Sequence, residues 1–241
     1  GGALLCSTAD LRPQTVALQI RADGGKVALI GTQDLHLLLF DVSQRHLIKV
    51  VSLAHRGEMG ALCFYPKPEI PLFVTGSTYG TVRFWDFARC SPIVGRVLRY
   101  SREEGVRSLD FSAAGDLLSI GHNNGMVRIL TFPDLQTVFG RKVTKGQAAV
   151  ACVRFSACGA QLAVGCHDTV VYVYRLSGEA RADGSGRPVV EFMMSIRGLS
   201  SAVTHVQFCG NAEFLIAASA DGGMLIAGAQ TGEKHGQSVL Q

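Results

Sequence analysis

The sequence predicts an all-β fold built from repeated sheets, and two observations support this. Within residues 55–90, three short apolar runs of period two end at Phe64, Val74 and Trp85, and turn residues separate them. No helical period fits between these runs, so each is expected to be a strand. The same pattern recurs four more times along the 241 residues. Such recurrence predicts a β-propeller of four-stranded blades.

The spacing of the repeats is regular. The last apolar residue of the first strand falls at Ile20, Phe64, Phe111, Phe155 and Phe208, in steps of 44, 47, 44 and 53. One blade cannot bury both of its faces alone, so the repeats are expected to stack against one another. The long step contains residues 177–188, an insertion rich in Gly, Ser and charge that we expect to be mobile.

All five blades are assigned to one propeller domain, at residues 15–54, 55–100, 101–143, 144–198 and 199–241. Residues 1–14 are interpreted as the end of a preceding blade. The fifth blade is expected to be truncated, because EKHGQSVLQ stops where an outer strand would begin. Since seven blades need roughly 300 residues at this repeat length, we expect an arc of a larger ring of about seven blades.

The repeats carry similar residues in the same columns: a small residue in the second strand, a turn residue three positions later and, six positions after that, a position where WD repeats favour an aromatic, filled here by Phe40, Trp85, Leu130, Tyr174 and Ala227. Asp and Asn suit the turn because their side chains hydrogen-bond the local backbone. Tyr79 occupies this turn column without an explanation from sequence. Trp85 is expected to pack in its blade, with an indole N–H that needs a partner. The predicted structural positions are Gly31, Asp34, Phe40, Asp41, Gly76, Trp85, Asp86, Gly121, Asn124, Gly165, Asp168 and Asp221.

The second repeat resembles a WD-repeat blade, with His55 ahead of its first strand, Gly-Ser in its second and Trp85-Asp86 closing its third. The order HRGEMGALCFYP, GTVRFWD, LAVGCHD with VYVY, and SSAVTH resembles the second propeller of echinoderm-microtubule-associated-protein-like (EMAP-like) proteins, over roughly residues 55–230. This resemblance implies a cytoskeletal scaffold in the cytoplasm whose partners are tubulin, microtubules or the axonemal proteins of a cilium or flagellum.

Reactive side chains show no catalytic or metal-binding spacing. The seven cysteines include no CxxC pair, which suits reduced thiols in a cytosolic protein, and no apolar run is long enough for a membrane span. His122, His167 and His205 lack metal-ligand partners at useful spacing, and neither GxSxG nor GK[ST] occurs. We therefore expect no enzyme, no metal and no cofactor, and we interpret Asp34 and the other turn aspartates as structural.

Charged residues are distributed unevenly along the sequence. The net charge of +4 comes from residues 89–145, where nine basic residues meet five acidic ones. Basic residues on or beside the predicted outer strands form a candidate partner-binding rim: Arg96, Arg99, Arg102, Arg141, Lys142 and Lys145. The rim either attracts an acidic partner or blocks pairing between strand edges of different molecules. Nucleic acid is disfavoured because Tyr100 is the only aromatic residue among these basic ones.

The favoured hypothesis is a non-catalytic WD-repeat scaffold of EMAP-like type that binds microtubules or a ciliary or axonemal assembly. The alternative is a general WD-repeat adaptor that holds a peptide or a subunit in a complex unrelated to microtubules.

Overall fold

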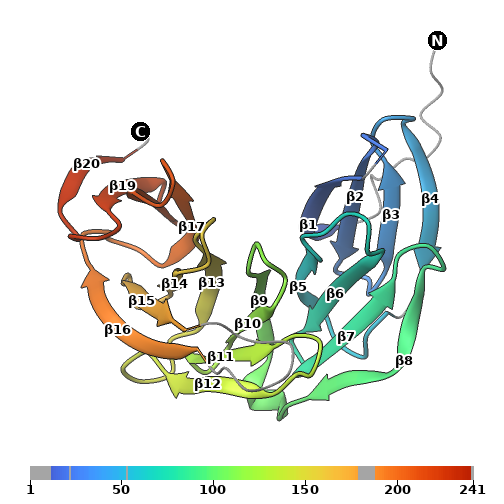
Figure 1. Ribbon diagram of the computed structural model, residues 1–241, viewed down its shortest axis with the longest axis horizontal. Coiled ribbons are helices and arrows are strands. Elements are labelled where there is room, and N and C mark those ends of the chain that lie inside the picture. Colours follow the sequence, from blue (N-terminus) through green and yellow to red (C-terminus); the bar gives the residue numbers. More distant parts are fainter. Residues whose placement is uncertain (1–11, 22, 53, 179–187, 240–241) are drawn as a thin grey trace. The chain divides into compact units, whose positions relative to one another are not determined.

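The computed structural model describes residues 12–178 and 188–239, except 22 and 53. The described residues form five four-stranded antiparallel sheets, so the predicted all-β propeller is confirmed (Figure 1). They divide between two compact units, Gly1–Val106 and Arg107–Gln241. Within the described ranges, the one helical element is the short 3-10 turn η2 (Arg102–Glu104), and no helix is long and apolar enough to cross a membrane.

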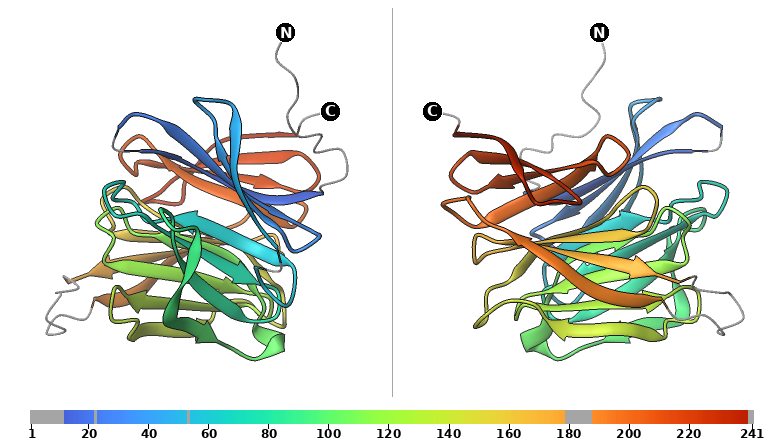
Figure 2. Two further views of the ribbon diagram at one scale, coloured as in Figure 1. Left: turned by 90° about the vertical axis from the view of Figure 1, so that its right-hand side faces the viewer. Right: turned by 60° about the vertical axis from the view of Figure 1, so that its left-hand side comes forward.

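The first unit contains sheets 1 and 2. Each sheet follows chain order, so its first and fourth strands are the two edges (Figures 1 and 2). Sheet 1 consists of β1 (Pro13–Ile20), β2 (Lys26–Thr32), β3 (Leu37–Asp41) and β4 (His46–Val51). Sheet 2 consists of β5 (Met59–Phe64), β6 (Leu72–Ser77), β7 (Thr81–Asp86) and β8 (Ser91–Arg99).

The second unit contains sheets 3, 4 and 5, again in chain order. Sheet 3 consists of β9 (Val106–Phe111), β10 (Leu117–His122), β11 (Met126–Thr131) and β12 (Thr137–Lys142). Sheet 4 consists of β13 (Val150–Phe155), β14 (Gln161–Cys166), β15 (Val171–Ser177) and β16 (Val189–Ile196). Sheet 5 consists of β17 (Val203–Cys209), β18 (Phe214–Ser219), β19 (Gly223–Gly228) and β20 (Lys234–Val239).

Neighbouring sheets within a unit pack through their first strands. In the first unit β5 lies against β1 and β2, and in the second unit β13 lies against β10 while β17 lies against β13 and β14. Three second-strand glycines, Gly31, Gly121 and Gly165, allow this approach. A Cβ atom at Gly165 would lie 2.6 Å from Cys152 Sγ and 2.7 Å from Val203 Cγ1. Only hydrogen fits there, because protein interiors are packed without spare volume.

The pairing of third and fourth strands is irregular at one recurring place. The register shifts just before Phe40, Trp85, Leu130, Tyr174 and Ala227, the column in which an aromatic residue is favoured. An extra residue on one strand bends the ladder locally and increases the twist of the sheet. The outer strand of every sheet is therefore bent at the same level.

The end of the fifth repeat corrects one expectation from the sequence. The expectation that the fifth blade stops before its outer strand is wrong, because Lys234–Val239 pairs with β19 as a fourth strand. Its side chains are almost all polar, and an edge strand needs only backbone hydrogen bonds to form. The sequence prediction relied on apolar alternation and therefore missed this strand.

Two further expectations fall partly outside the described residues. The insertion lies between β15 and β16, but residues 179–187 are not described. Of the proposed preceding blade, residues 1–11 are likewise outside the description, while Pro13 and Gln14 belong to β1. The expected arc of about seven blades stays a prediction.

Candidate interaction surface

A buried hydrogen-bond network joins two strands of sheet 2, β6 and β7, to the loop that precedes β5. Trp85 Nε1 donates to Thr75 Oγ1 at 2.7 Å, and His55 Nε2 lies 2.6 Å from the same oxygen. His55 Nδ1 lies 2.9 Å from Thr81 Oγ1. Burial, and secondarily the charge of Arg83, lower the pKa of His55 to about 3, so the imidazole is neutral. A neutral ring that accepts at Nε2 and donates at Nδ1 satisfies every bond.

The Trp85 ring also stacks on Phe73, with ring centroids 5.8 Å apart and an angle of 2° between the planes. Both rings are almost completely buried. Trp85 therefore acts as a packing residue whose polar edge is satisfied internally, and its indole is not available to a ligand.

The turn residues between the second and third strands cap their own turns in the second unit. Asn124 Oδ1 accepts from the Met126 N–H, Asp168 Oδ1 from Val170 and Asp221 Oδ1 from Gly223, at 3.1 to 3.3 Å. Hydrogen bonds from Ser200, Ser219 and Gly223 lower the pKa of Asp221 to about 2. Asp34 is exposed in the equivalent turn of sheet 1.

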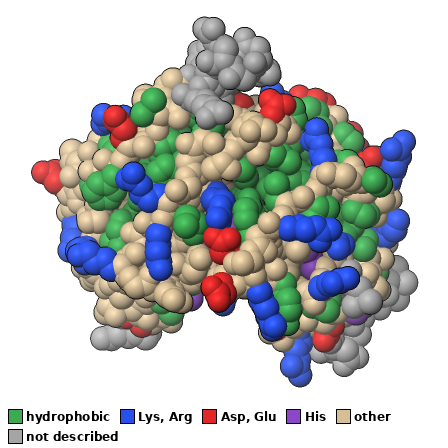
Figure 3. All heavy atoms as spheres, turned by 90° about the horizontal axis from the view of Figure 1, so that it is seen from below, with side chains coloured by type: hydrophobic (Ala, Val, Ile, Leu, Met, Phe, Trp, Pro, Cys, Tyr) green, Lys and Arg blue, Asp and Glu red, His purple; other side chains and the backbone are tan. Residues whose placement is uncertain are grey.

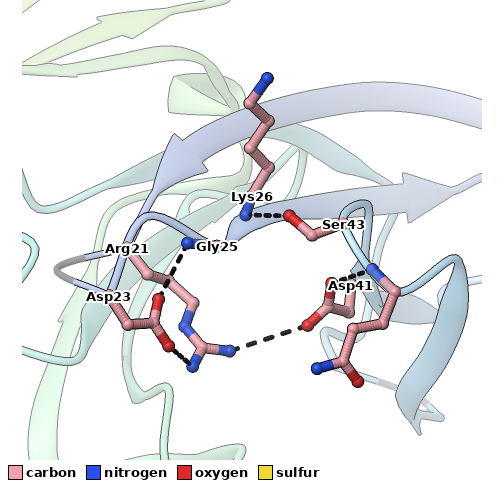
Figure 4. A network of polar contacts seen from close by, with 7 residues as sticks. Arg21, Asp23, Gly25, Lys26, Asp41 and Ser43 are labelled. Atoms are coloured by element: carbon pink, nitrogen blue, oxygen red, sulfur yellow. Dashed lines mark hydrogen bonds and ion pairs between the residues drawn. The ribbon is translucent and has the colours of Figure 1, made fainter.

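The two aspartates that follow an aromatic residue cap the turn from third to fourth strand. Asp41 Oδ1 accepts from the Gln44 N–H at 2.8 Å, and Asp86 Oδ1 accepts from the Arg89 N–H at 3.0 Å. Arg21 ties Asp41 to the neighbouring turn, since its guanidinium contacts Asp23 and lies 3.8 Å from Asp41 (Figure 4). Each of these aspartates therefore acts locally on backbone geometry.

The basic rim residues divide between the two units. Arg96 and Arg99 lie on the outer strand β8 and Arg102 in η2, all in the first unit; Arg141 and Lys142 end β12 and Lys145 follows it, in the second. All are exposed except Arg96, which is half-buried. On the face shown in Figure 3, Lys and Arg side chains lie among apolar and neutral atoms rather than in a continuous basic surface.

Tyr79 and Arg102 form a contact that the sequence did not predict. The Arg102 Cζ lies 4.4 Å from the centroid of the Tyr79 ring, and Arg102 Nη2 donates to Tyr79 Oη at 3.0 Å. The two residues come from different loops of the same sheet. The sequence did contain one signal, an aromatic side chain in a column otherwise filled by Asp and Asn.

The histidines singled out from the sequence occupy different settings. His122 is buried, with Arg128 Nη1 3.0 Å from its Nε2, whereas His167 and His205 are exposed. Burial raises the pKa of the Cys152 thiol to about 11. Within the described part of the chain, no group of three or more His, Cys, Asp or Glu side chains could hold a metal ion.

Comparison with known proteins places these features in a family. The family model described as "WD domain, G-beta repeat" matches residues 47–86 and 140–175. Echinoderm microtubule-associated protein-like 3 of Homo sapiens is 27% identical over 225 residues, covering 91% of this chain and 23% of that protein.

Two further relatives show the same degree of similarity. Echinoderm microtubule-associated protein-like 2 of Homo sapiens is 30% identical over 169 residues, covering 69% of this chain and 23% of that protein. The 77 kDa echinoderm microtubule-associated protein of Strongylocentrotus purpuratus is 29% identical over 180 residues, covering 74% of this chain and 24% of that protein. The chain thus spans about a quarter of the length of these relatives. It is a WD40 β-propeller protein with distant similarity, over most of its length, to the EMAP-like proteins.

Proposed function

We propose that this chain is a non-catalytic scaffold that binds microtubules, either in the cytoplasmic cytoskeleton or in a ciliary axoneme. The similarity to relatives named as microtubule-associated carries this proposal, because it extends over most of the chain. Propellers of this family typically act as protein-binding scaffolds rather than as enzymes. A rigid array of sheets supports such a role, since a surface that is already ordered loses little entropy on binding.

The basic rim is the proposed contact with tubulin. Its residues occupy edge strands or the loops that follow them, and five of the six are exposed to solvent. Exposed guanidinium and ammonium groups attract an acidic surface over several ångströms, and this attraction falls as salt increases. The same charges also protect β8 and β12 from pairing with the strand edges of other molecules.

The test reverses the charge of the rim in one unit. We expect the triple variant Arg96→Glu, Arg99→Glu, Arg102→Glu to reduce the affinity for microtubules by about tenfold at low salt, which corresponds to about 1.4 kcal/mol. Co-sedimentation over a series of tubulin concentrations measures the affinity. Circular dichroism confirms that the sheets remain folded. A second triple variant, Arg141→Glu, Lys142→Glu, Lys145→Glu, tests the other unit in the same way.

A matched control separates a specific contact from net charge. The variant Lys26→Glu, Arg45→Glu, Lys67→Glu carries the same change in charge at exposed positions outside the rim. If this control and the rim variants pellet equally, the rim is not the contact. If the wild-type protein fails to pellet with microtubules at low salt, the microtubule proposal is wrong. The chain is then better described as a general WD-repeat adaptor.

A further inference from the structure

The Tyr79 side chain does not cap its own turn. The equivalent residues Asn124, Asp168 and Asp221 each accept a hydrogen bond from a backbone N–H two residues later. The phenol side chain of Tyr79 does not accept this bond. The turn in sheet 2 instead has a hydrogen bond in which the Tyr79 N–H donates to Ser77 Oγ at 3.0 Å. The Tyr79 side chain is therefore available for another role.

The position of the ring is fixed by the loop that precedes β5. Any Cβ atom at residue 57 would overlap carbon atoms of the Tyr79 ring, so the ring lies directly against the backbone of Gly57. The loop after β8 is held beside the same turn, because the Tyr100 N–H donates to the Gly80 carbonyl at 2.8 Å. Two loops thus hold the ring in place, yet 43% of Tyr79 remains exposed.

Among the described residues, Arg102 uses one of its five N–H groups in a side-chain hydrogen bond while it lies against this ring. Its guanidinium lies 4.4 Å from the ring centroid and donates one bond, to Tyr79 Oη. Among the residues that the structure describes, no carboxylate lies within ion-pair distance of Arg102, although the adjacent Glu103 is also exposed. A guanidinium has five N–H donors in a planar fork that matches the two oxygens of a carboxylate.

We propose that Tyr79 and Arg102 form a docking site for a Glu or Asp side chain in an acidic segment of a partner protein. The carboxylate binds the free edge of the guanidinium through paired N–H···O bonds, which are stronger than bonds between neutral groups. The Tyr79 ring holds the guanidinium in one orientation, so less side-chain entropy is lost when the partner binds.

The charges beside the pair are of both signs. Exposed Arg56 and Glu58 flank Gly57 in sequence, and exposed Glu103 follows Arg102. Recognition at this site therefore rests on the geometry of the guanidinium rather than on charge alone. A planar, stacked guanidinium still distinguishes a carboxylate from an amide, because an amide offers only one acceptor oxygen.

This inference extends beyond the proposed function. Arg102 also belongs to the basic rim, but the docking site requires the planar shape of Arg102 and the ring of Tyr79, whereas rim attraction requires only charge. It also does not require that the acidic segment belong to tubulin.

The probe is a fluorescein-labelled ten-residue peptide with Glu at alternate positions, compared with the same peptide carrying Gln. Fluorescence anisotropy at constant ionic strength measures both affinities. We expect Arg102→Ala and Arg102→Lys each to weaken binding of the Glu peptide at least about fivefold, because the planar fork is lost in both. Tyr79→Asn is expected to weaken it about threefold, since a cation–π contact on an exposed surface contributes modestly.

Controls keep the outcomes distinct. Asn caps this turn in sheet 3, so Tyr79→Asn should unfold at nearly the same temperature as the wild-type protein, and Arg45→Ala removes an exposed charge elsewhere in the first unit. Equal binding of the Glu and Gln peptides, wild-type affinity of Arg102→Lys, or equal losses in Arg45→Ala and Arg102→Ala would each overturn the docking site. Failure of microtubule binding with intact, Arg102-dependent peptide binding would reject only the proposed function.

Discussion

Sheets 2 and 4 have the same four-stranded topology, yet they fill equivalent positions with different chemistry. In sheet 2, Thr75 receives the Trp85 indole N–H and contacts His55 in a buried polar network. In sheet 4, Val164 occupies the position equivalent to Thr75, and Tyr174 occupies the position equivalent to Trp85. The Tyr174 ring packs on Phe139 and Phe192, with centroids 5.4 Å and 5.8 Å apart.

The difference shows that the aromatic column can be held in place in two ways. A polar network specifies one orientation of the ring, because a buried indole N–H without a partner is costly. An aromatic cluster holds the ring through buried apolar surface and edge-to-face contacts, which tolerate more variation in the orientation of the ring. An aromatic ring at this level is therefore held without any one particular hydrogen bond, and Leu130 and Ala227 at the same position of sheets 3 and 5 show that the fold does not require a ring there.

The largest expected effect comes from removing the central oxygen of sheet 2. Thr75→Val keeps the shape but leaves the Trp85 N–H and His55 without their shared partner. We expect a loss of about 3 kcal/mol in the free energy of unfolding, because each buried unsatisfied group costs about 1–3 kcal/mol. Urea denaturation followed by Trp85 fluorescence measures it, since Trp85 is the only tryptophan.

Thr75→Ser provides the matched control, because it retains the oxygen and loses only a methyl group. Its loss should be no more than about half that of Thr75→Val. Equal losses in the two variants would show that packing, rather than the hydrogen bonds, holds the Trp85 ring.

Lowering the pH should reduce the free energy of unfolding, because His55, in the loop before the first strand of sheet 2, becomes protonated on unfolding. Its pKa is lowered to about 3 in the folded protein and returns to about 6.5 on unfolding. The unfolded state therefore binds more protons between these values, so stability is lost as the pH falls from 6.5 towards 3. Between pH 7 and pH 5, His55 is expected to account for a loss of about 2 kcal/mol in the free energy of unfolding.

The measurement compares urea denaturation of wild-type protein and His55→Gln at both pH values. The comparison is needed because Asp110 acts in the opposite direction: burial raises its pKa to about 6, so the folded state binds its proton more tightly. His55→Gln should show the smaller loss on acidification. An unchanged pH dependence would mean that His55 is not the acid-sensitive group.

The smallest change in stability is expected when a threonine replaces the valine of sheet 4 that is equivalent to Thr75. Val164→Thr places a hydroxyl group among Leu162, Cys166 and Tyr174, which form an apolar cluster. Burying a hydroxyl there should cost about 1 kcal/mol, at the lower end of measured values because a strand backbone carbonyl can accept its proton. Thermal unfolding measures the change. Stabilisation by Val164→Thr would contradict the contrast drawn between the two sheets.

Much of the fold could be predicted because the relevant information is local. Period-two alternation and turn residues predicted the strands up to β19, and the repeat spacing predicted that they form separate sheets. The strand β20 was missed because Lys234, His235 and Gln237 carry no apolar signal. An edge strand can form from backbone pairing with its neighbour alone.

The candidate site was less predictable. The sequence indicated that Trp85 needs a hydrogen-bond partner and that Tyr79 departs from its column, but it could not identify Thr75 or Arg102 as the partners. Those contacts depend on which strands and loops lie side by side and on the rotamers that packing allows.

For this protein, the sequence alone determined that the chain forms short strands in five repeated sheets, since burial of alternate side chains and turn formation are properties of neighbouring residues. Folding in three dimensions determined that the Tyr79 ring lies on Gly57 and under Arg102. These residues are distant in sequence, and their contact exists only because two loops of one sheet converge on the same turn.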